Sequence, residues 1–445
     1  MNTASHILHG LWRRDDGQQL DFNALALWVE LVKTLERGRF DVIFFADVHG
    51  VYGPPDASFR RPIKAGLQIP SNDPAVILSA LASHTEHLGL AITSSIVQDH
   101  PFSFARKLST LDHASQGRIA WNIVTNGLAN GARNFGHDDL TPHDERYAWA
   151  EEYMEVVYKL WEGSWDDGAL LADRTRGVHA DPDKVHRINH RGPRYRVEGP
   201  HLVTPSPQRT PLLFQAGSSP AGMDFAARHA EAVFLMAPAP ALAAQAIAAI
   251  RARLTAYGRA ADAIKFFQGL SFIIGSTEAE VARRDRELDE AIDHEAMISH
   301  LGGVMGIDLE VDALDRPIDT LHTEGAQSLL DWVRASVHGR VPTVRDIGLL
   351  ASRSSRVSGT PEGIADQLAV WQAAGIAGIN VINAVIPGSY IEFIEHLMPV
   401  LRRRGLAATG YQPGSLRRKL FGHDRLQAPH PAAAWRGAFS TSHPP

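Results

Sequence analysis

The chain has 445 residues, of which 44% are hydrophobic and 21% are charged, and its formal net charge is −6. This is ordinary globular composition, and no apolar run reaches the roughly 18 residues of a membrane span. Lys and Arg are scattered along a net acidic chain, so we expect no nucleic-acid partner and no membrane partner. Cysteine is absent, which excludes disulfides and a cysteine nucleophile and fits a cytoplasmic protein without a secretory signal.

Strand-like runs rich in Val, Ile and Phe alternate with segments of helical spacing, which predicts parallel βαβ units. The predicted strands lie near 5–9, 41–46, 88–94, 118–125, 211–217, 231–236, 266–274 and 378–386. The predicted helices lie near 23–38, 74–86, 101–115, 142–162, 219–229, 240–257, 277–293, 361–375 and 389–403. Strands and helices in this number predict an α/β fold, a (β/α)8 TIM barrel, with an open doubly wound sheet as the alternative. No G-x-G-x-x-G follows a strand, which counts against a dinucleotide-binding sheet.

Two long segments do not fit a minimal barrel. Residues 163–210 and 295–345 show little periodicity, so we interpret them as insertions or lids. We expect residues 1–405 to form a single barrel and 406–445 to form a C-terminal surface tail. The basic cluster 417–419 within this tail is predicted to be solvated.

Polar side chains appear where three apolar strands end, and this is where a (β/α)8 barrel builds its active site. Asp47 ends the run FDVIFFAD, Thr93 and Ser95 end LGLAITSS, and Asn122 lies inside GRIAWNIVT. A buried amide without partners costs roughly 1–3 kcal/mol, so Asn122 serves either a backbone network or a ligand. The structural alternative for Asp47 is a turn or helix-capping carboxylate. For the hydroxyls of Thr93 and Ser95 it is termination of the strand.

Two segments have features of an anion site. His143 and Tyr147 are spaced i, i+4 and lie on one face of a predicted helix near its start. Ser218 and Ser219 precede Pro220, which suits the first position of a helix. Free backbone N–H groups and the helix dipole favour a phosphate at such a position. A capping His and a core Tyr are the structural alternatives.

Metal and serine-nucleophile chemistry are not expected. The histidines at 84–87 and 294–300 lack the H-E-x-x-H spacing of a zinc helix, and no G-x-S-x-G elbow occurs. Phe44, Phe45 and Trp121 are interpreted as core residues.

Several motifs resemble one family in order and spacing: GRIAWNIVTN, ARNFG and HDERYAWAEEYMEVVYKLW, with FFAD before them and AGSS after them. They resemble the flavin-dependent two-component monooxygenases of the bacterial luciferase-like superfamily, in the group that oxidises nitrilotriacetate, dibenzothiophene sulfone and long-chain alkanes. The resemblance implies reduced FMN as cofactor, supplied by a separate NAD(P)H:flavin reductase. It also implies that O2 adds to the flavin as a C4a-(hydro)peroxide, which oxygenates a small organic substrate.

The resemblance also assigns roles to residues. Asp47, Thr93, Ser95 and Asn122 would line the flavin ring. The phosphate would be held by four further residues, which are His143, Tyr147, Ser218 and Ser219. On the substrate side, Tyr52 and Gln68 lie in the motif YGPPDASFRRPIKAGLQIPSNDP, which is predicted to overhang the barrel mouth. Asn122, Tyr52 and Gln68 are the candidate catalytic residues. At residues 126–128 the sequence departs from the family's pattern, so the identity of the substrate stays open.

Two other functions remain open at this stage. A deazaflavin-dependent oxidoreductase on the same barrel would transfer hydride without oxygen. A non-catalytic flavin-binding barrel would bind FMN without forming an oxygenated product. The family resemblance further implies a homodimer or homotetramer.

Overall fold

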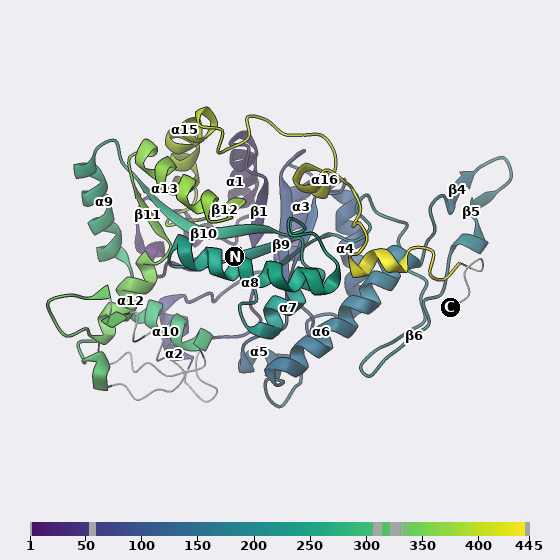
Figure 1. Cartoon of the computed structure of the whole chain (residues 1–445), viewed down its shortest axis with the longest axis horizontal. Helices are drawn as coiled ribbons and strands as arrows, with labels where there is room; N and C mark the ends of the chain where they lie inside the picture. The colour runs from purple at the N-terminus through teal and green to yellow at the C-terminus, as the bar shows by residue number, and fades with distance from the viewer. Residues whose placement is uncertain are drawn as a thin grey trace.

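The computed structural model describes residues 2–440 except 53–58, 306–313, 321–329, 331–332 and 335. Eight parallel strands form one central sheet that helices surround, a TIM-barrel-like α/β fold (Figure 1). The strands are β1 (Val42–Phe45), β2 (Gly89–Ser95), β3 (Ile119–Val124), β8 (Leu212–Gln215), β9 (Ala232–Leu235), β10 (Lys265–Ile274), β11 (Arg356–Gly359) and β12 (Gly378–Ile382). The predicted fold class is confirmed.

Strand order follows the chain through β1, β2, β3, β8, β9 and β10. The long strand β10 then pairs with β9, β12 and β11 in turn along its length. The register of β2 on β3 places Thr93 opposite Asn122. Within the part of the chain that the structure describes, no ladder joins β12 back to β1.

The outer helices follow the strands and start at residues that suit a helix N-terminus. They are α1 (Leu25–Arg37), α3 (Pro74–Ala82), α4 (Pro101–Ala114), α6 (His143–Tyr158), α7 (Pro220–His229), α8 (Pro240–Leu254), α9 (Glu278–Ala291), α13 (Pro361–Ala373), α14 (Gly388–Glu392) and α15 (Met398–Arg403). Asp73, Ser219 and Thr360 each accept a backbone N–H with a side-chain oxygen and are followed by proline. This pairing of cap and proline fixes where these helices begin.

Two apolar clusters attach the helices to the sheet. One packs α1, α3, α4 and α6 against β1 to β3 and contains Trp28, Phe104 and Trp121. The other packs α7, α8, α13 and α15 against β9 to β11. Trp121 is fully buried and its Nε1 donates to the Ser94 carbonyl at 3.0 Å, which confirms its prediction as a core residue.

The predicted strand at 5–9 is wrong, and β11 was missed. Residues 5–9 form bends and a turn before the short 3-10 helix η1 (Leu11–Arg13), and Leu8 packs in a cluster with Ile273 of β10. Strand β11 has only one core residue, Val357, while the Arg356 side chain, which is 3% exposed, pairs with Asp285 and Asp289 of α9. Because Arg356 forms ion pairs at a position where a core strand usually has an apolar residue, the sequence has no apolar run to indicate this strand.

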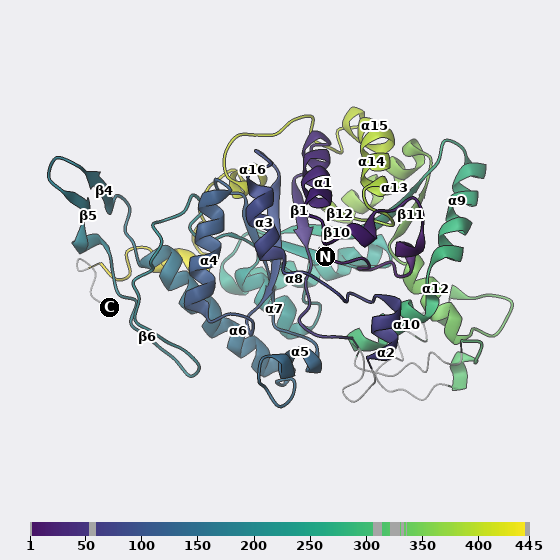
Figure 2. The ribbon, with the colours of Figure 1, turned by 180° about the vertical axis from the view of Figure 1, so that it is seen from behind.

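The two insertions extend the barrel in different directions. Residues 163–210 contain the hairpins β4 (Leu170–Asp173) with β5 (Val178–Ala180) and β6 (His190–Arg191) with β7 (Arg196–Val197), which project from one side in Figures 1 and 2. The other insertion contributes α10 (His294–Met305) and α12 (Val344–Arg353), and much of 306–335 lies outside the described residues. Helices α2 (Arg60–Ala65) and α5 (Ala129–Asn134), which come after β1 and β3 in the chain, lie along the lower edge of Figure 1 together with α10. The carboxyl ends of the strands therefore lie toward that edge.

The C-terminal segment packs on the barrel through α16 (Leu416–Phe421). Arg417 is fully buried, and its Nε donates to Glu231 Oε1 at 2.6 Å. Its guanidinium also donates to the carbonyl oxygens of Thr210 and Pro211. The prediction of a solvated cluster at 417–419 is therefore wrong for Arg417, because a partner 186 residues away supplies the opposite charge. The division of the chain at residue 405 stays a prediction.

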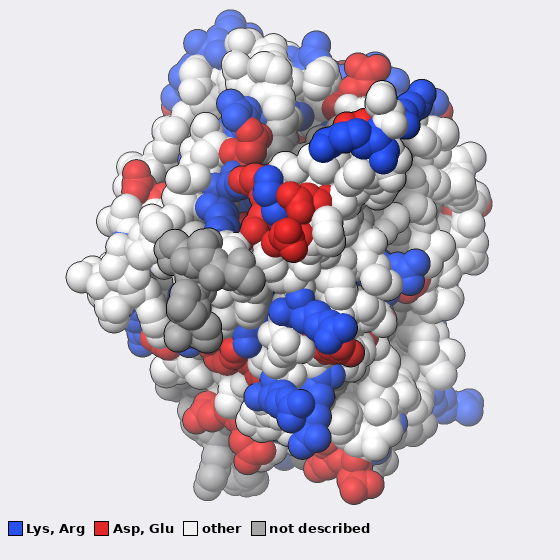
Figure 3. Space-filling view, turned by 90° about the vertical axis from the view of Figure 1, so that its right-hand side faces the viewer, with Lys and Arg blue, Asp and Glu red and all other residues white. Residues whose placement is uncertain are grey.

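Charges of both signs share the surface. On the face shown in Figure 3, patches of Lys and Arg lie beside patches of Asp and Glu. No helix within the described residues is long and apolar enough to cross a membrane.

The buried Arg417–Glu231 pair gives a stability prediction. Arg417→Met leaves the Glu231 carboxylate buried without its cation, so the free energy of unfolding in urea should fall by about 3–5 kcal/mol. Arg417→Met with Glu231→Gln should recover part of this loss, because no charge is then buried alone. The matched control is Arg418→Met, whose exposed pair with Asp424 should contribute less than about 1 kcal/mol. Equal effects of Arg417→Met and Arg418→Met would contradict the assignment.

Candidate active site

The centre of the barrel mouth contains a half-satisfied amide. Asn122 on β3 is buried, and its Nδ2 donates to Thr93 Oγ1 on β2 at 3.0 Å. Its Oδ1 is buried and has no hydrogen-bond partner among the described residues. A buried acceptor left unpaired costs about 1–3 kcal/mol. The unpaired Oδ1 thus marks a place where a ligand N–H or O–H group is needed.

Asp47 follows β1 at the same end of the barrel. Its carboxylate accepts the Val48 N–H at 3.0 Å, and its Oδ2 lies 3.8 Å from His49 Nε2. Burial raises the pKa of Asp47 to about 7, against the opposing effect of the Val48 hydrogen bond. Near neutral pH this carboxyl group is therefore available both as a proton donor and as an acceptor.

His143 and Tyr147 of α6 meet the start of α7. His143 Nε2 lies 3.0 Å from Ser219 Oγ, and the rings of His143 and Tyr147 lie 5.1 Å apart. Burial raises the pKa of Tyr147, while hydrogen bonds with the side chains of Ser219, Thr125 and Gln215 lower it. The three predicted residues His143, Tyr147 and Ser219 are thus brought together.

The start of α7 is a compact cradle. Ser219 caps the helix by accepting the Gly222 N–H at 3.1 Å. A Cβ on Gly217 would lie 2.8 Å from Tyr147 Oη, and one on Gly222 would lie 2.7 Å from it, so glycine is required for this close approach. Ser218 is exposed and has no hydrogen-bond partner among the described residues. The cradle therefore presents one free hydroxyl together with the N-terminus of a ten-residue helix.

On the other side of the mouth, Tyr52 and Gln68 converge on a residue that sequence reasoning missed. The Tyr52 ring lies 4.6 Å from the ring of His300 on α10, and Gln68 Nε2 lies 3.4 Å from His300 Nε2. Gln68 adopts a φ of 52° and donates to the His6 carbonyl at 2.6 Å, while its Oε1 is buried and unpaired. Residues 53–58 of the predicted overhanging loop lie outside the described residues.

His300 continues into a chain of hydrogen-bonding groups. His300 Nδ1 lies 2.9 Å from His9 Nε2, and His9 Nδ1 lies 2.7 Å from Ser5 Oγ. Burial lowers the pKa of His300 to about 4 and that of His9 well below its ordinary value. Both imidazoles are therefore neutral at pH 7, and each carries one N–H that it can pass along the chain. His9 and His300 lie 291 positions apart, so no spacing in the sequence could have paired them.

The remaining predicted residues are less connected. Ser95 accepts the Val97 N–H at 3.4 Å, and among the described residues it forms no hydrogen bond with another candidate. Phe45 is buried as predicted, whereas Phe44 is only half-buried and lines a cavity inside the barrel, which corrects its assignment to the core. Among the described residues, no cluster of His, Cys, Asp or Glu is arranged to hold a metal ion.

Together, a TIM-barrel-like α/β fold and polar side chains at the carboxyl ends of its strands are the arrangement in which barrel enzymes build their active sites. The family described as "Luciferase-like monooxygenase" matches residues 1–378. The chain belongs to this family and is a luciferase-like monooxygenase.

Relatives cover nearly the whole chain. Dimethyl-sulfide monooxygenase of Hyphomicrobium sulfonivorans is 41% identical and covers 99% of this chain and 93% of its own. Long-chain alkane monooxygenase of Geobacillus thermodenitrificans is 40% identical, and the match covers 99% of this chain and 97% of the relative. A solved structure of riboflavin lyase with modified FMN and riboflavin has a TM-score of 0.85 at 36% identity, with 97% of this chain and 98% of that chain covered.

The raised pKa of Asp47 gives a pH prediction. Its pKa is about 7 when folded but about 3.9 when unfolded, so between these values only the unfolded chain has lost the proton. The wild-type apoprotein should therefore lose stability relative to Asp47→Asn as pH rises from 5 to 7, by at most about 1.4 kcal/mol per pH unit. Above about pH 8 the difference should stay constant. Urea unfolding at each pH measures it, and a difference that does not change with pH would refute the assignment.

Proposed function

We propose that the chain is the oxygenase of a two-component system, which uses reduced FMN and O2 to oxygenate a small organic substrate. The observation that carries this proposal is the unpaired Asn122 Oδ1, which lies at the carboxyl ends of the strands. The pyrimidine part of a flavin ring offers N–H groups that suit such an acceptor. Thr93 holds the amide in place from the neighbouring strand.

The described residues fit FMN at two further points. Asp47 follows β1 and Asn122 lies on β3, and each offers a hydrogen-bond acceptor for the ring. Ser218, Ser219 and His143 surround the start of α7, where a phosphate dianion gains hydrogen bonds and the helix dipole. One phosphate cradle and no dinucleotide motif favour a mononucleotide flavin over FAD.

The chain's residues position the cofactor and exclude water around it. When bound there, reduced FMN would supply the oxygen chemistry. Asn122 and Thr93 hold the ring in the mouth, while His143 and Tyr147 stand at the phosphate end. On the substrate side, the neutral pair His9 and His300 links Ser5 to Gln68 by hydrogen bonds and so holds the Gln68 side chain in place.

We propose a small apolar substrate, such as an organic sulfide or a hydrocarbon. The wall around Tyr52 is apolar and contains Ala65, Leu67 and Ala296, with Val48 and Leu128 packed against it. Two relatives carry names for dimethyl sulfide and long-chain alkanes, which belong to this chemical class. We further propose that a separate NAD(P)H:flavin reductase supplies reduced FMN, and that the chain acts as a cytoplasmic homodimer or homotetramer.

The phosphate cradle is tested with Ser218→Ala. Hydrogen bonds to charged groups contribute about 1.5–3 kcal/mol, so FMN affinity should fall at least about tenfold while riboflavin affinity stays unchanged. Calorimetry with both flavins measures this. Ser219→Ala is the informative comparison, because it also removes a helix cap and should lower stability by about 0.5–2 kcal/mol. Equal losses for FMN and riboflavin in Ser218→Ala would place this serine away from the phosphate.

The ring position is tested with Asn122→Leu, which keeps the volume but removes the amide. FMN should still bind, several-fold more weakly, while product per reduced flavin falls and hydrogen peroxide rises, since an error of about 1 Å can cost about a hundredfold in rate. The assay supplies reduced FMN from a separate reductase, labelled O2, and a panel of sulfides, sulfones and alkanes. Thr93→Val, which removes only the partner of Nδ2, should show a smaller loss.

Two outcomes of this assay would overturn the proposal. Unchanged product yield in Asn122→Leu would make Asn122 a structural strand residue. Steady NADH oxidation by the wild-type chain without added reductase would reject the two-component arrangement.

A further inference from the structure

The barrel wall is open between its first and last strands. Strand β12 is half-exposed at residues 378–381, whereas β2 is buried over its whole length and β3 over residues 119–123. Within the described residues, β12 pairs only with β10 and β1 pairs only with β2. The strands of a TIM barrel normally pair with two neighbours and enclose a packed interior. The exposure of β12 therefore indicates a gap in the barrel wall between β12 and β1.

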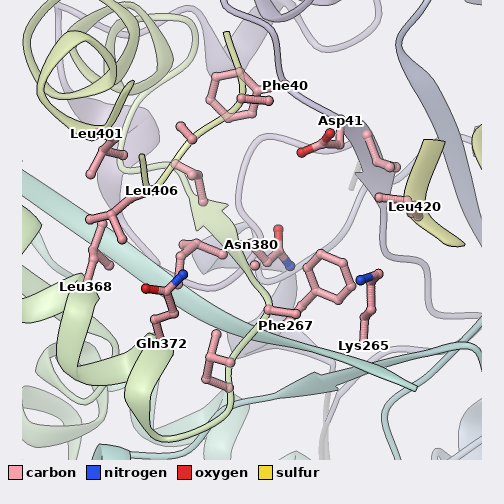
Figure 4. A pocket seen from close by; sticks show the side chains of 18 of the residues that line it. Phe40, Asp41, Lys265, Phe267, Leu368, Gln372, Asn380, Leu401, Leu406 and Leu420 are labelled. Atoms are coloured by element: carbon pink, nitrogen blue, oxygen red, sulfur yellow. The ribbon is translucent and has the colours of Figure 1, made fainter. Parts of the chain in front are cut away.

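A cavity of about 410 Å3 occupies this gap at the amino ends of the strands (Figure 4). Four phenylalanine rings from inside the barrel form one wall, and these are Phe44, Phe214, Phe234 and Phe267. Leu368, Leu401 and Leu406 lie across the cavity from Phe267. Its size and aromatic lining are those of a small-molecule pocket, which typically measures about 300–1,000 Å3.

The aromatic wall is held in a fixed arrangement. The rings of Phe44 and Phe234 lie 4.4 Å apart, and Phe214 stacks on Phe234 at 5.1 Å. A Cβ on Gly378 would lie 2.6 Å from Phe267 Cε1, so only glycine lets this ring lie against β12. The pocket is thus built by packed aromatic side chains on neighbouring strands.

The lining combines these apolar side chains with polar ones, of which Lys265 and Asn380 lie beside Phe267 (Figure 4). Lys265 on β10 and Asn380 on β12 line the cavity, and neither side chain has a hydrogen-bond or ion-pair partner among the described residues. Lys265 Nζ lies 5.4 Å from the centre of the Phe421 ring, which is a weak substitute for an anion. Among the charged lining residues described, Arg39, Lys265 and Lys419 are cationic and only Asp41 is a carboxylate.

We propose that this pocket is a second binding site for a small amphipathic monocarboxylate. The carboxylate would accept hydrogen bonds from Lys265 Nζ and Asn380 Nδ2, and a short alkyl or aryl body would pack between the phenylalanine rings. The site lies at the amino ends of the strands, opposite the mouth that holds Asn122 and Ser218. It is therefore independent of the proposed flavin chemistry.

The probe is 8-bromooctanoate, because bromine quenches a tryptophan that it contacts and Trp371 lines the pocket. We expect saturable quenching with one molecule bound per chain, and Trp371→Phe should remove the quenching without removing binding by calorimetry. Lys265→Met keeps the aliphatic stem and should weaken binding at least tenfold. Asn380→Leu should weaken it independently, while Lys184→Met, in the projecting insertion, is the matched control and should bind like wild type.

Two further measurements test whether the pocket selects a carboxylate and whether it is separate from the flavin site. Octylamine should not bind, and octanol should bind more weakly than octanoate. Saturating FMN should leave octanoate affinity unchanged. The proposal is overturned if FMN displaces octanoate, if octylamine binds as well as octanoate, or if folded Lys265→Met, checked by circular dichroism, binds like wild type.

Discussion

The contact between Asn122 and Thr93 is the interaction on which the candidate site depends. It joins two buried strands through their side chains and uses only one half of the amide, because the other half faces the mouth unpaired. A protein interior tolerates such a group only where something else satisfies it. The parallel register that places Thr93 opposite Asn122 therefore fixes both the position and the hydrogen-bonding direction of the site.

Around this centre, elements distant in the chain supply different chemistry. The start of α7 offers dipole, hydroxyl and close backbone approach, all of which favour an anion. The opposite rim is neutral and apolar, since burial keeps His9 and His300 uncharged beside Tyr52. A charged end and a neutral end suit a cofactor phosphate on one side and an apolar substrate on the other.

The two ends of the barrel are stabilised in contrasting ways. At the amino ends, Arg417 of the C-terminal segment is buried against Glu231 and four backbone carbonyls, so a charge far along the chain closes part of the barrel floor. Within the described part of the chain, no strand pairing closes the wall between β1 and β12. An incomplete floor leaves aromatic side chains and Lys265 facing a cavity, where a packed layer of side chains is usual.

The sequence by itself determined the alternation of strands and helices, the helix starts at Ser219 and Pro220, and the polar ends of β2 and β3, because these depend on local periodicity and capping. The sequence pattern predicted a strand at 5–9 that does not form, because the apolar residues there pack on β10 without joining the sheet. It gave no indication of β11, where ion pairs of Arg356 take the place of apolar burial. Only the tertiary structure decided that His9 meets His300 and that Arg417 meets Glu231, since contacts between residues 291 and 186 positions apart follow from chain closure and leave no local pattern.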